Sequence, residues 1–354
     1  MQFSLFFFAN HEGGGNHKYT LIKEAAKWAD NNEFVAVWLP ERHFHAFGGL
    51  SPNPSVVGAA LSTITENIQI RSGSVVTPLH DPVRIVEEWS VVDNLSHGRV
   101  GLGVACGWVP NDFVIADHQE TFETRKQAFA DSIDTISRLW RGESLSRVNP
   151  HGETIDIHTL PEPVQDKAPI WITAAANPDT FAQAGELGVN LLTHLLGQSI
   201  EGLGKKVEVY RDAWRAAGHP GRGTITLMLH TFVGDSDEEV YDIVREPMKR
   251  YLGSSLDLAI AHPETVPFLP GAGEVEAEVF TPEMVDQMLE ASFERYFFES
   301  SLLGTAESCV ELVELAREED VDEMACLIDF GLETDVVLPA LEKLNQVRVM
   351  SNGG

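Results

Sequence analysis

The 354-residue sequence contains few cysteines and few basic residues. Its three cysteines, Cys106, Cys309 and Cys326, lie far apart and form neither a CxxC pair nor a cysteine–histidine cluster at zinc-ligand spacing. A low, odd count excludes a disulfide framework and suits a reducing compartment, so we expect a cytoplasmic protein without a structural metal. Only 25 lysines and arginines face 54 aspartates and glutamates, which gives a formal net charge of −29. So acidic a surface repels nucleic acid and anionic lipid, and we exclude both as main partners.

The sequence also lacks a hydrophobic run that is long enough to span a membrane. The N-terminal segment MQFSLFFFANHEGG is apolar but short, follows no basic residues and contains no small-residue cleavage site. We therefore expect neither a signal peptide nor a membrane anchor, and we interpret the run as a buried first strand. The hydrophobic fraction of 43% and the charged fraction of 22% are typical of a globular protein. Disorder is expected only at the last four residues, 351–354.

Apolar runs of the β type alternate along the chain with amphipathic stretches at helical spacing. The runs lie at 3–9, 34–39, 68–77, 100–105, 170–174, 190–194, 224–233 and 323–330, and the amphipathic stretches lie at 19–31, 53–65, 82–95, 121–140, 178–187, 200–217, 237–252, 305–319 and 334–347. Eight strand-then-helix units predict an α/β protein whose parallel sheet closes into a (β/α)8 TIM barrel. An open doubly wound sheet is the alternative, but no G-x-G-x-x-G fingerprint opens the first unit.

Two segments rich in proline and glycine interrupt this alternation, at about 141–168 and 253–282. No linker separates the regular units on either side of them. We therefore interpret both segments as insertions into one barrel domain, 1–354.

In such a barrel, the active site lies where the strands end and the loops begin. The segment after the second strand, PERHFHAFGG, brings Glu41, Arg42, His43 and His45 to the mouth of the barrel. Histidine is the side chain best suited to proton transfer near neutral pH. The alternative is that these residues only cap the strand end and pair with one another.

The third and fourth strands end in small and β-branched residues. The segment 72–84, SGSVVTPLHDPVR, could form a flat wall for a planar ring, or it could belong to the barrel core. The segment 101–113, GLGVACGWVPNDF, has glycine or alanine at alternate positions, which leaves room for a ligand close to the backbone. Trp108 could act as a lid or as a stacking surface. Cys106 is a weak candidate nucleophile, because no partner histidine is fixed by the sequence.

The loops after the fifth and sixth strands offer a possible anion site. Asn177 is predicted to cap a helix that starts at Pro178, and the unpaired amides of a helix start attract phosphate, although a plain cap explains the same pattern. Arg125, near the start of a long helix, could supply a cation to that phosphate, or could simply be solvated. Three polar groups among leucines after the sixth strand could line the same cavity: Thr193, His194 and Gln198.

Taken together and in this order, these segments resemble the luciferase-like flavin monooxygenases. The segments that carry the resemblance are PERHFHAFGG, SVVTPLHDPVR, NLSHGRVGLGVACGW, PIWITAAANPDTF and THLLGQS, and it extends from Phe3 to about Leu344. The chain further resembles the branch associated with polyketide and non-ribosomal peptide biosynthesis, through ERHFHAFGGLSPNPSV, GWVPNDF, HTFVGD and ACLIDFG.

This resemblance implies a (β/α)8 barrel that uses reduced FMN as a diffusible co-substrate, molecular oxygen, and a separate flavin reductase. His43 matches the family's active-site histidine after the second strand. The positions matched to flavin contacts, or expected to line the same site, are Ser74, Val75, Val76, Ala105, Cys106, Arg125, Ala175, Ala176, Asn177 and Thr193. Ser74 to Val76 match the stretch under the flavin ring, and Arg125 and Ala175 to Asn177 match the phosphate contacts.

Two positions depart from bacterial luciferase itself. That protein has a phosphate-holding arginine where Cys106 aligns, so the phosphate site of this chain is short of one cation. Its reactive cysteine aligns with Ala105, so a thiol role at that position is absent.

From the resemblance we predict an FMN-dependent monooxygenase that acts on a natural-product intermediate, bound to a carrier protein. The reaction is hydroxylation or insertion of oxygen next to a carbonyl, and the sequence does not choose between them. Three alternatives stay open: a deazaflavin-dependent oxidoreductase, a barrel that binds flavin without catalysis, and a barrel enzyme of unrelated chemistry. The resemblance also implies a possible homodimer.

Overall fold

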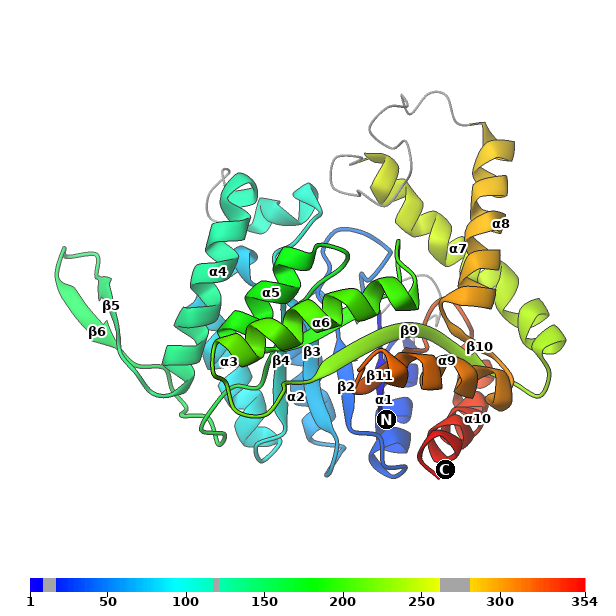
Figure 1. Ribbon diagram of the computed structural model, residues 1–354. Coiled ribbons are helices and arrows are strands. Elements are labelled where there is room, and N and C mark those ends of the chain that lie inside the picture. The colour runs from blue at the N-terminus through cyan, green and yellow to red at the C-terminus, as the bar shows by residue number, and fades with distance from the viewer. Residues whose placement is uncertain (9–16, 117–120, 262–280, 354) are drawn as a thin grey trace.

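A closed barrel of eight parallel strands forms the centre of the computed structural model, which describes residues 1–8, 17–116, 121–261 and 281–353 (Figure 1). Going round the barrel, the strands follow the order β1, β2, β3, β4, β7, β8, β9 and β11, and β11 pairs with β1 to close the ring. Their bounds are β1 (Gln2–Phe6), β2 (Ala36–Leu39), β3 (Gln69–Val76), β4 (Val100–Ala105), β7 (Ile170–Thr173), β8 (Asn190–His194), β9 (Ile225–Val233) and β11 (Glu323–Leu327). The predicted (β/α)8 barrel is confirmed, and the open-sheet alternative is wrong.

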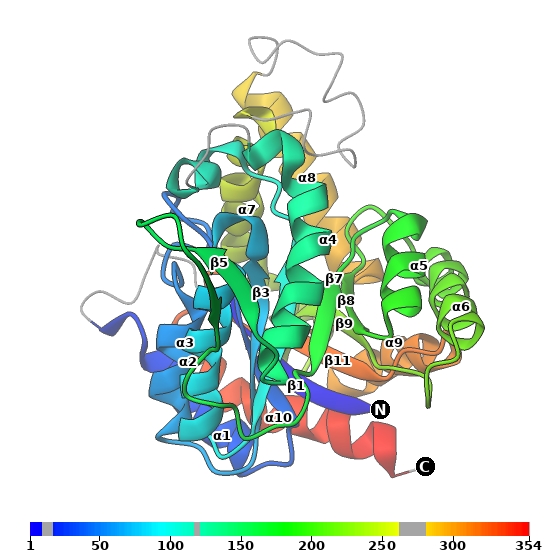
Figure 2. The same cartoon turned by 90° about the vertical axis from the view of Figure 1, so that its left-hand side faces the viewer.

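Helices follow the strands and cover the outside of the barrel (Figure 2). Each turns an apolar side inward, as α1 does with Leu21, Ile22 and Ala25. The helices of this layer are α1 (Thr20–Asp30), α2 (Pro54–Ser62), α3 (Pro82–Leu95), α4 (Thr121–Trp140), α5 (Pro178–Leu187), α6 (Ile200–Ala216), α9 (Ala306–Glu318) and α10 (Thr334–Asn352). Among the described residues, no helix is both long and apolar enough to cross a membrane.

The seventh unit of the barrel is more elaborate than the sequence predicted. Helix α7 (Asp237–Ala261) runs on into the expected insertion at 253–282, and residues 262–280 of that insertion lie outside the described residues. Two further elements follow that were not predicted, α8 (Pro282–Glu299) and β10 (Leu302–Gly304), which pairs with the end of β9. Figure 1 shows α7 and α8 extending together beyond the barrel.

The other expected insertion, about 141–168, contains two short strands of its own. Strands β5 (Leu145–Val148) and β6 (Thr154–Ile157) form an antiparallel hairpin that projects away from the barrel in Figure 1. The expectation of disorder at 351–354 is wrong at its start, because α10 continues to Asn352. Ser351 is buried there, and its hydroxyl donates to the carbonyl of Val347.

The inside of the barrel is filled by an ion pair between two tryptophan rings. Arg71 on β3 donates to both carboxylate oxygens of Glu323 on β11, at 3.0 and 2.8 Å. Its guanidinium lies 4.8 Å from the ring centroid of Trp38 and 4.3 Å from that of Trp171. A Cβ atom at Gly101 would lie 2.8 Å from Cγ of Arg71, so this position has no room for a side chain. Because the barrel is packed at this level, a site for ligands is left at the carboxyl ends of the strands.

Candidate active site

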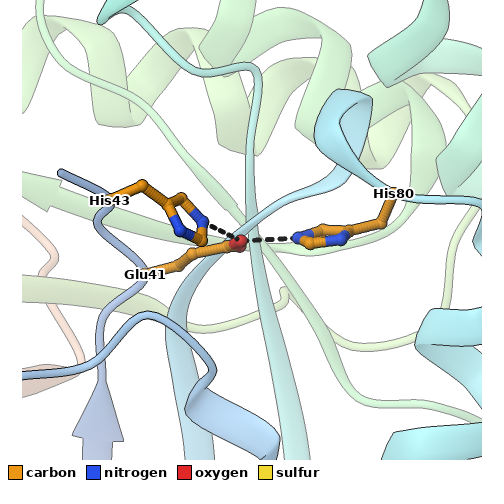
Figure 3. Close-up of side chains that lie close together, drawn as sticks. All are labelled: Glu41, His43 and His80. Atoms are coloured by element: carbon orange, nitrogen blue, oxygen red, sulfur yellow. Dashed lines mark hydrogen bonds and ion pairs between the residues drawn. The ribbon is translucent and has the colours of Figure 1, made fainter. Parts of the chain in front are cut away.

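A buried carboxylate joins the loops that follow β2 and β3. Glu41 comes two residues after β2, and its side chain is fully buried. Its Oε1 atom lies 2.9 Å from Nε2 of His43 and 2.5 Å from Nε2 of His80, as Figure 3 shows. Its Oε2 atom accepts the backbone N–H of Val76, the last residue of β3, at 2.7 Å. We call Glu41, His43 and His80 the carboxylate–histidine cluster.

The cluster favours a negative charge on Glu41 and a positive charge on His80. Burial would raise the pKa of Glu41, but hydrogen bonds from His43, His80 and Val76, together with the charge of His80, lower it below its ordinary value of 4.5. Burial would lower the pKa of His80, but the hydrogen bond and charge of Glu41 raise it above its ordinary value of 6.5. The cluster can therefore hold a proton on an imidazole at the mouth of the barrel.

The structure brings the predicted His43 into the site and separates it from His45. His43 is half-buried against Glu41, whereas Nδ1 of His45 accepts the backbone N–H of Phe47 at 3.1 Å within its own turn. Sequence reasoning placed Glu41 at the barrel mouth but gave it no role, and it gave none to His80. A signal was present, since both lie just past the ends of neighbouring parallel strands, which meet at one end of the barrel.

The same three residues could also hold a metal ion, because one ligand atom from each lies within 4.8 Å of the others. Two histidines and one carboxylate are a ligand set that iron(II) accepts. Here, however, the oxygens of Glu41 already accept three hydrogen bonds. We therefore interpret the cluster as a hydrogen-bonded proton carrier.

The three residues expected under a flavin ring face different surroundings. Ser74 Oγ shares a hydrogen bond with Thr173 Oγ1, which joins the ends of β3 and β7. The pairing of β3 with β4 shifts register between Ser72 and Val75, and the peptide bond before Ser74 is cis. Val75 packs into the main hydrophobic core, and Val76 packs beside Phe113. Of the three, Ser74 is thus the residue whose polar atom reaches the end of β7, which lies two strands away in the barrel.

The residues at the end of β4 lie beside two cations of α4. Burial raises the pKa of the Cys106 thiol, while the positive charges of Arg125 and Lys126 oppose the rise. The guanidinium of Arg125 donates to the carbonyl of Phe122 at 2.6 Å and lies 3.8 Å from the centroid of that ring. Both cations are therefore near the end of β4, where Ala105 is half-buried. Lys126 is a positive charge that sequence reasoning missed.

The loop between β7 and α5 is exposed and leads into a capped helix. Ala175, Ala176 and Asn177 are exposed, and the side chain of Asn177 caps α5 by accepting the N–H of Asp179 at 3.0 Å. Gln198, which the sequence analysis placed near the same cavity, connects this loop to Lys206, a cation that the sequence analysis missed. Gln198 donates to the carbonyl of Ala175 at 3.3 Å, and its Oε1 accepts from Lys206 on α6. The positive charge of Lys206 is thus connected to the loop through Gln198.

Thr193 and His194 lie on opposite faces of β8. Side chains alternate along a strand, and Leu191 packs into the core cluster under the helices, whereas Leu192 packs with Trp38 inside the barrel. His194 therefore faces the barrel interior together with Leu192. Thr193 faces the helices with Leu191, where its hydroxyl is buried with no hydrogen-bond partner among the described residues. The structure thus separates Thr193 from the other expected flavin contacts.

A buried ion pair connects the loop after β2 to the 3-10 helix after β4 (Pro110–Ile115). Arg42 lies 3.0 Å from Asp112, and burial lowers the pKa of the guanidinium and raises that of the carboxyl. The guanidinium is 5.0 Å from the ring centroid of Trp108. Trp108, considered as a lid in the sequence analysis, is thus held half-buried against Arg42.

Comparison of the sequence with known proteins finds likeness along nearly all of the chain. The family model described as luciferase-like monooxygenase matches residues 1–323. The oxygenase component of the flavin-dependent trigonelline monooxygenase of Acinetobacter baylyi is 23% identical over 355 residues, which cover 97% of this chain and 93% of that protein. The 4-hydroxyprotoasukamycin monooxygenase of Streptomyces nodosus subsp. asukaensis is 25% identical over 304 residues, covering 83% of this chain and 76% of that protein.

Solved structures share the fold at 18% sequence identity. A monooxygenase from Streptomyces bottropensis superposes with a TM-score of 0.79, covering 99% of this chain and 100% of its own. The oxygenating constituent of 3,6-diketocamphane monooxygenase from Pseudomonas putida, a type II Baeyer–Villiger enzyme in complex with FMN, gives 0.74 and covers 98% and 96%. An F420-dependent secondary alcohol dehydrogenase gives 0.70 and covers 98% and 100%. At this identity, these similarities establish the fold.

Proposed function

This chain belongs to the luciferase-like flavin-dependent monooxygenases, and from that membership we propose that it oxygenates an organic substrate with reduced FMN and molecular oxygen. A separate reductase supplies the reduced flavin, in keeping with the relative that is named as an oxygenase component. When bound, the reduced flavin provides the electrons with which oxygen is activated.

The residues at the carboxyl ends of β3, β4 and β7 fit such a cofactor. Strands β3 and β4 approach closely just below these ends, since a Cβ atom at Gly103 would lie 2.2 Å from the carbonyl oxygen of Ser72. A flat, narrow wall of this kind suits a planar ring. The exposed loop 175–177 and the N-terminus of α5 would hold the phosphate, with Arg125 and Lys206 as the nearby positive charges.

The structural observation that supports the proposal best is the carboxylate–histidine cluster at the end of β2. Figure 3 shows both imidazoles directed at one oxygen of Glu41. We assign His43 the transfer of a proton to or from the reacting oxygen. Glu41 and His80 act through His43, because they fix the orientation of its ring and set the charge beside it. The cluster lies at the end of β2, next to the wall formed by β3.

For the substrate, we propose a natural-product intermediate that is delivered on a carrier protein and is hydroxylated or receives an inserted oxygen. The Streptomyces nodosus relative is named as a monooxygenase, and the diketocamphane enzyme is named as a Baeyer–Villiger enzyme, which supports insertion of oxygen as one of the two reaction types. Carrier proteins are acidic, and this chain has a formal net charge of −29, so docking requires a local basic surface. Faster turnover of a carrier-bound acid than of the free acid supports the proposal, and equal rates contradict delivery by a carrier.

The proposed function is tested by loading the protein with reduced FMN under anaerobic conditions and then adding ¹⁸O₂. We expect oxygen consumption and one labelled oxygen atom in each product molecule. Reduced F420 serves as the comparison, because a deazaflavin enzyme also shares the fold. Hydride transfer with F420 and no consumption of oxygen would instead identify a deazaflavin-dependent oxidoreductase. Retention of FMN without oxygen consumption would instead identify a flavin-binding protein.

A further inference from the structure

A histidine that no part of the proposed mechanism uses lies inside the barrel mouth on β9. His230 pairs in register with Leu327, the last residue of β11, so it lies at the carboxyl end of the barrel. Alternation places it on the same face of β9 as Met228 and Phe232, which pack in the cluster inside the barrel. The residue is 6% exposed.

Three aromatic rings enclose His230, and each meets it edge to face. Tyr251 of α7 and Tyr296 of α8 lie 5.1 Å away between ring centroids, and Phe330, just after β11, lies 5.7 Å away. Phe47 from the loop after β2 continues the surface, 5.0 Å from Tyr251. We call these five residues the aromatic enclosure.

Nε2 of His230 is buried without a hydrogen-bond partner among the described residues. Burial, with a smaller effect from His194 on the next strand, lowers the pKa of His230 to about 3, so the ring is neutral at physiological pH. An unpaired buried polar atom destabilises a protein, and native structures retain few of them. A phenylalanine would fill the same space among aromatic rings without this penalty. The imidazole is therefore better explained by a partner that enters the enclosure and does not belong to the described residues.

The order of the strands places the enclosure opposite the proposed flavin site. The flavin residues follow β3, β4 and β7, whereas the enclosure is built on β9, on β11 and on the loop after β2. The carboxylate–histidine cluster, at the ends of β2 and β3, lies where the two halves of the mouth meet. A substrate in the enclosure would thus have the flavin on one side and the proton carrier beside it.

We propose that the aromatic enclosure binds the substrate, and that the substrate group held there is uncharged and apolar with a single hydroxyl or carbonyl oxygen, which hydrogen-bonds to Nε2 of His230. The enclosure disfavours a charged group, because none of its five residues carries a charge that would compensate for the lost water. This inference rests on the proposed function and specifies its substrate class.

Binding of three small probes tests the proposal without knowledge of the natural substrate. The probes are propylbenzene, 4-propylphenol and butyrophenone, whose dissociation constants are measured by calorimetry on the full chain. We expect the better of the two oxygenated probes to bind wild-type protein about tenfold more tightly than propylbenzene. The variant His230→Phe should lose this preference and still bind propylbenzene. His230→Gln, which restores a polar group, should recover part of the preference.

His219→Phe serves as the matched control, since His219 precedes β9 and lies at the opposite end of the barrel, bonded to the carbonyl of Glu186. It should leave the preference unchanged. Equal binding of all three probes by wild-type protein contradicts the proposal, and so does a preference that survives in His230→Phe. The melting temperature of the free protein is a second readout. His230→Phe should keep or raise it, whereas a marked fall means that the imidazole already has a partner, such as a bound water only, and also contradicts the proposal.

The two proposals can fail separately. FMN affinity and oxygen consumption of His230→Phe are measured alongside the probes, and FMN affinity should stay at the wild-type value. If no form of the protein binds FMN or consumes oxygen, the proposed function fails, while the probe preferences still decide the role of His230.

Discussion

Nε2 of His80 lies 2.5 Å from Oε1 of Glu41, although the two residues are 39 positions apart in the chain. The barrel produces this approach, because β2 and β3 are parallel neighbours whose carboxyl ends lie side by side. Glu41 follows the end of β2, and a single helical turn after β3 (Thr77–Leu79) brings His80 back over it. His43 approaches the same oxygen from its own loop. Side chains from the ends of β2 and β3 thus form one group that can hold a proton.

Replacing Glu41 by glutamine should reduce kcat by about 100-fold or more, because His43 loses the charge that orients it. The affinity for FMN should change little. The measurement is product formed per oxygen consumed, which should fall as reduced flavin is oxidised without product. Glu24→Gln, an exposed carboxylate paired with Lys27, is the control and should behave as wild type. A Glu41→Gln enzyme with wild-type coupling contradicts the role of the cluster.

The cluster should also make the stability of the protein depend on pH. The pKa of Glu41 is lowered, so its contribution to the free energy of unfolding is present above about pH 4.5 and is lost as the pH falls. The pKa of His80 is raised, so its contribution is present below about pH 6.5 and is lost as the pH rises through the folded-state value. The stability difference between wild type and His80→Asn, from urea unfolding, should therefore be largest between these two values. A stability difference between wild type and His80→Asn that grows above pH 8 would contradict the raised pKa of His80.

Removal of metal ions should leave the enzyme unchanged. The oxygens of Glu41 accept hydrogen bonds from two imidazoles and one amide, which already satisfy the carboxylate. Dialysis against a chelator, followed by FMN titration and oxygen-consumption measurements, should give wild-type values. Loss of activity on dialysis and its recovery with iron(II) or zinc would show that Glu41, His43 and His80 act as ligands.

Breaking the ion pair inside the barrel should destabilise the fold strongly. Glu323→Gln leaves the guanidinium of Arg71 buried without its counter-charge, and changes of this kind cost about 3–5 kcal/mol. The double variant Arg71→Met, Glu323→Leu removes both charges and should lose less stability than Glu323→Gln alone. The measurement is the free energy of unfolding by denaturant of the wild type, the single variant and the double variant. A double variant that is less stable than Glu323→Gln would show that the attraction between Arg71 and Glu323 exceeds the free energy lost when their charges are buried.

The proposed phosphate site predicts a selective effect of Arg125→Ala. The affinity for FMN should fall by about tenfold, as expected for loss of one charge-assisted hydrogen bond. The affinity for riboflavin, which has no phosphate, should stay the same. Arg141→Ala, an exposed arginine paired with Glu143, is the control. Equal loss of affinity for both flavins would place Arg125 elsewhere than at the phosphate.

Much of the fold could be predicted because the alternation of apolar runs and amphipathic stretches is strong. The predicted bounds of β4, β8, α4 and α5 agree with the structure to the residue. Helix α8 was missed because the segment 283–304, which follows the expected insertion, was given no element, although Thr281 followed by proline marks its first turn. Its amphipathic pattern is weak, and the helix packs both against α7 and, through Tyr296, against His230 in the barrel mouth.

The candidate site could be predicted only in part, because the sequence gives positions along strands and not the directions of side chains. His43 was recognised from its place after β2, but the approach of His80 to Glu41 depends on the turn after β3. Strand alternation could have separated Thr193 from His194 before the structure was known. His230 gave no signal as a residue in an apolar strand, because its aromatic neighbours come from α7, α8 and the segment after β11.

The most direct test of the central claim follows the flavin absorbance after protein loaded with reduced FMN is mixed with oxygen. If the protein is an oxygenating enzyme, we expect a transient absorbance spectrum that belongs to neither reduced nor oxidised flavin. This transient should persist for longer than free reduced FMN takes to be oxidised in buffer. His43→Ala should still form this transient and yet lose product. Direct return to oxidised flavin at the rate seen in buffer, both without substrate and with carrier-bound substrates, would contradict the account.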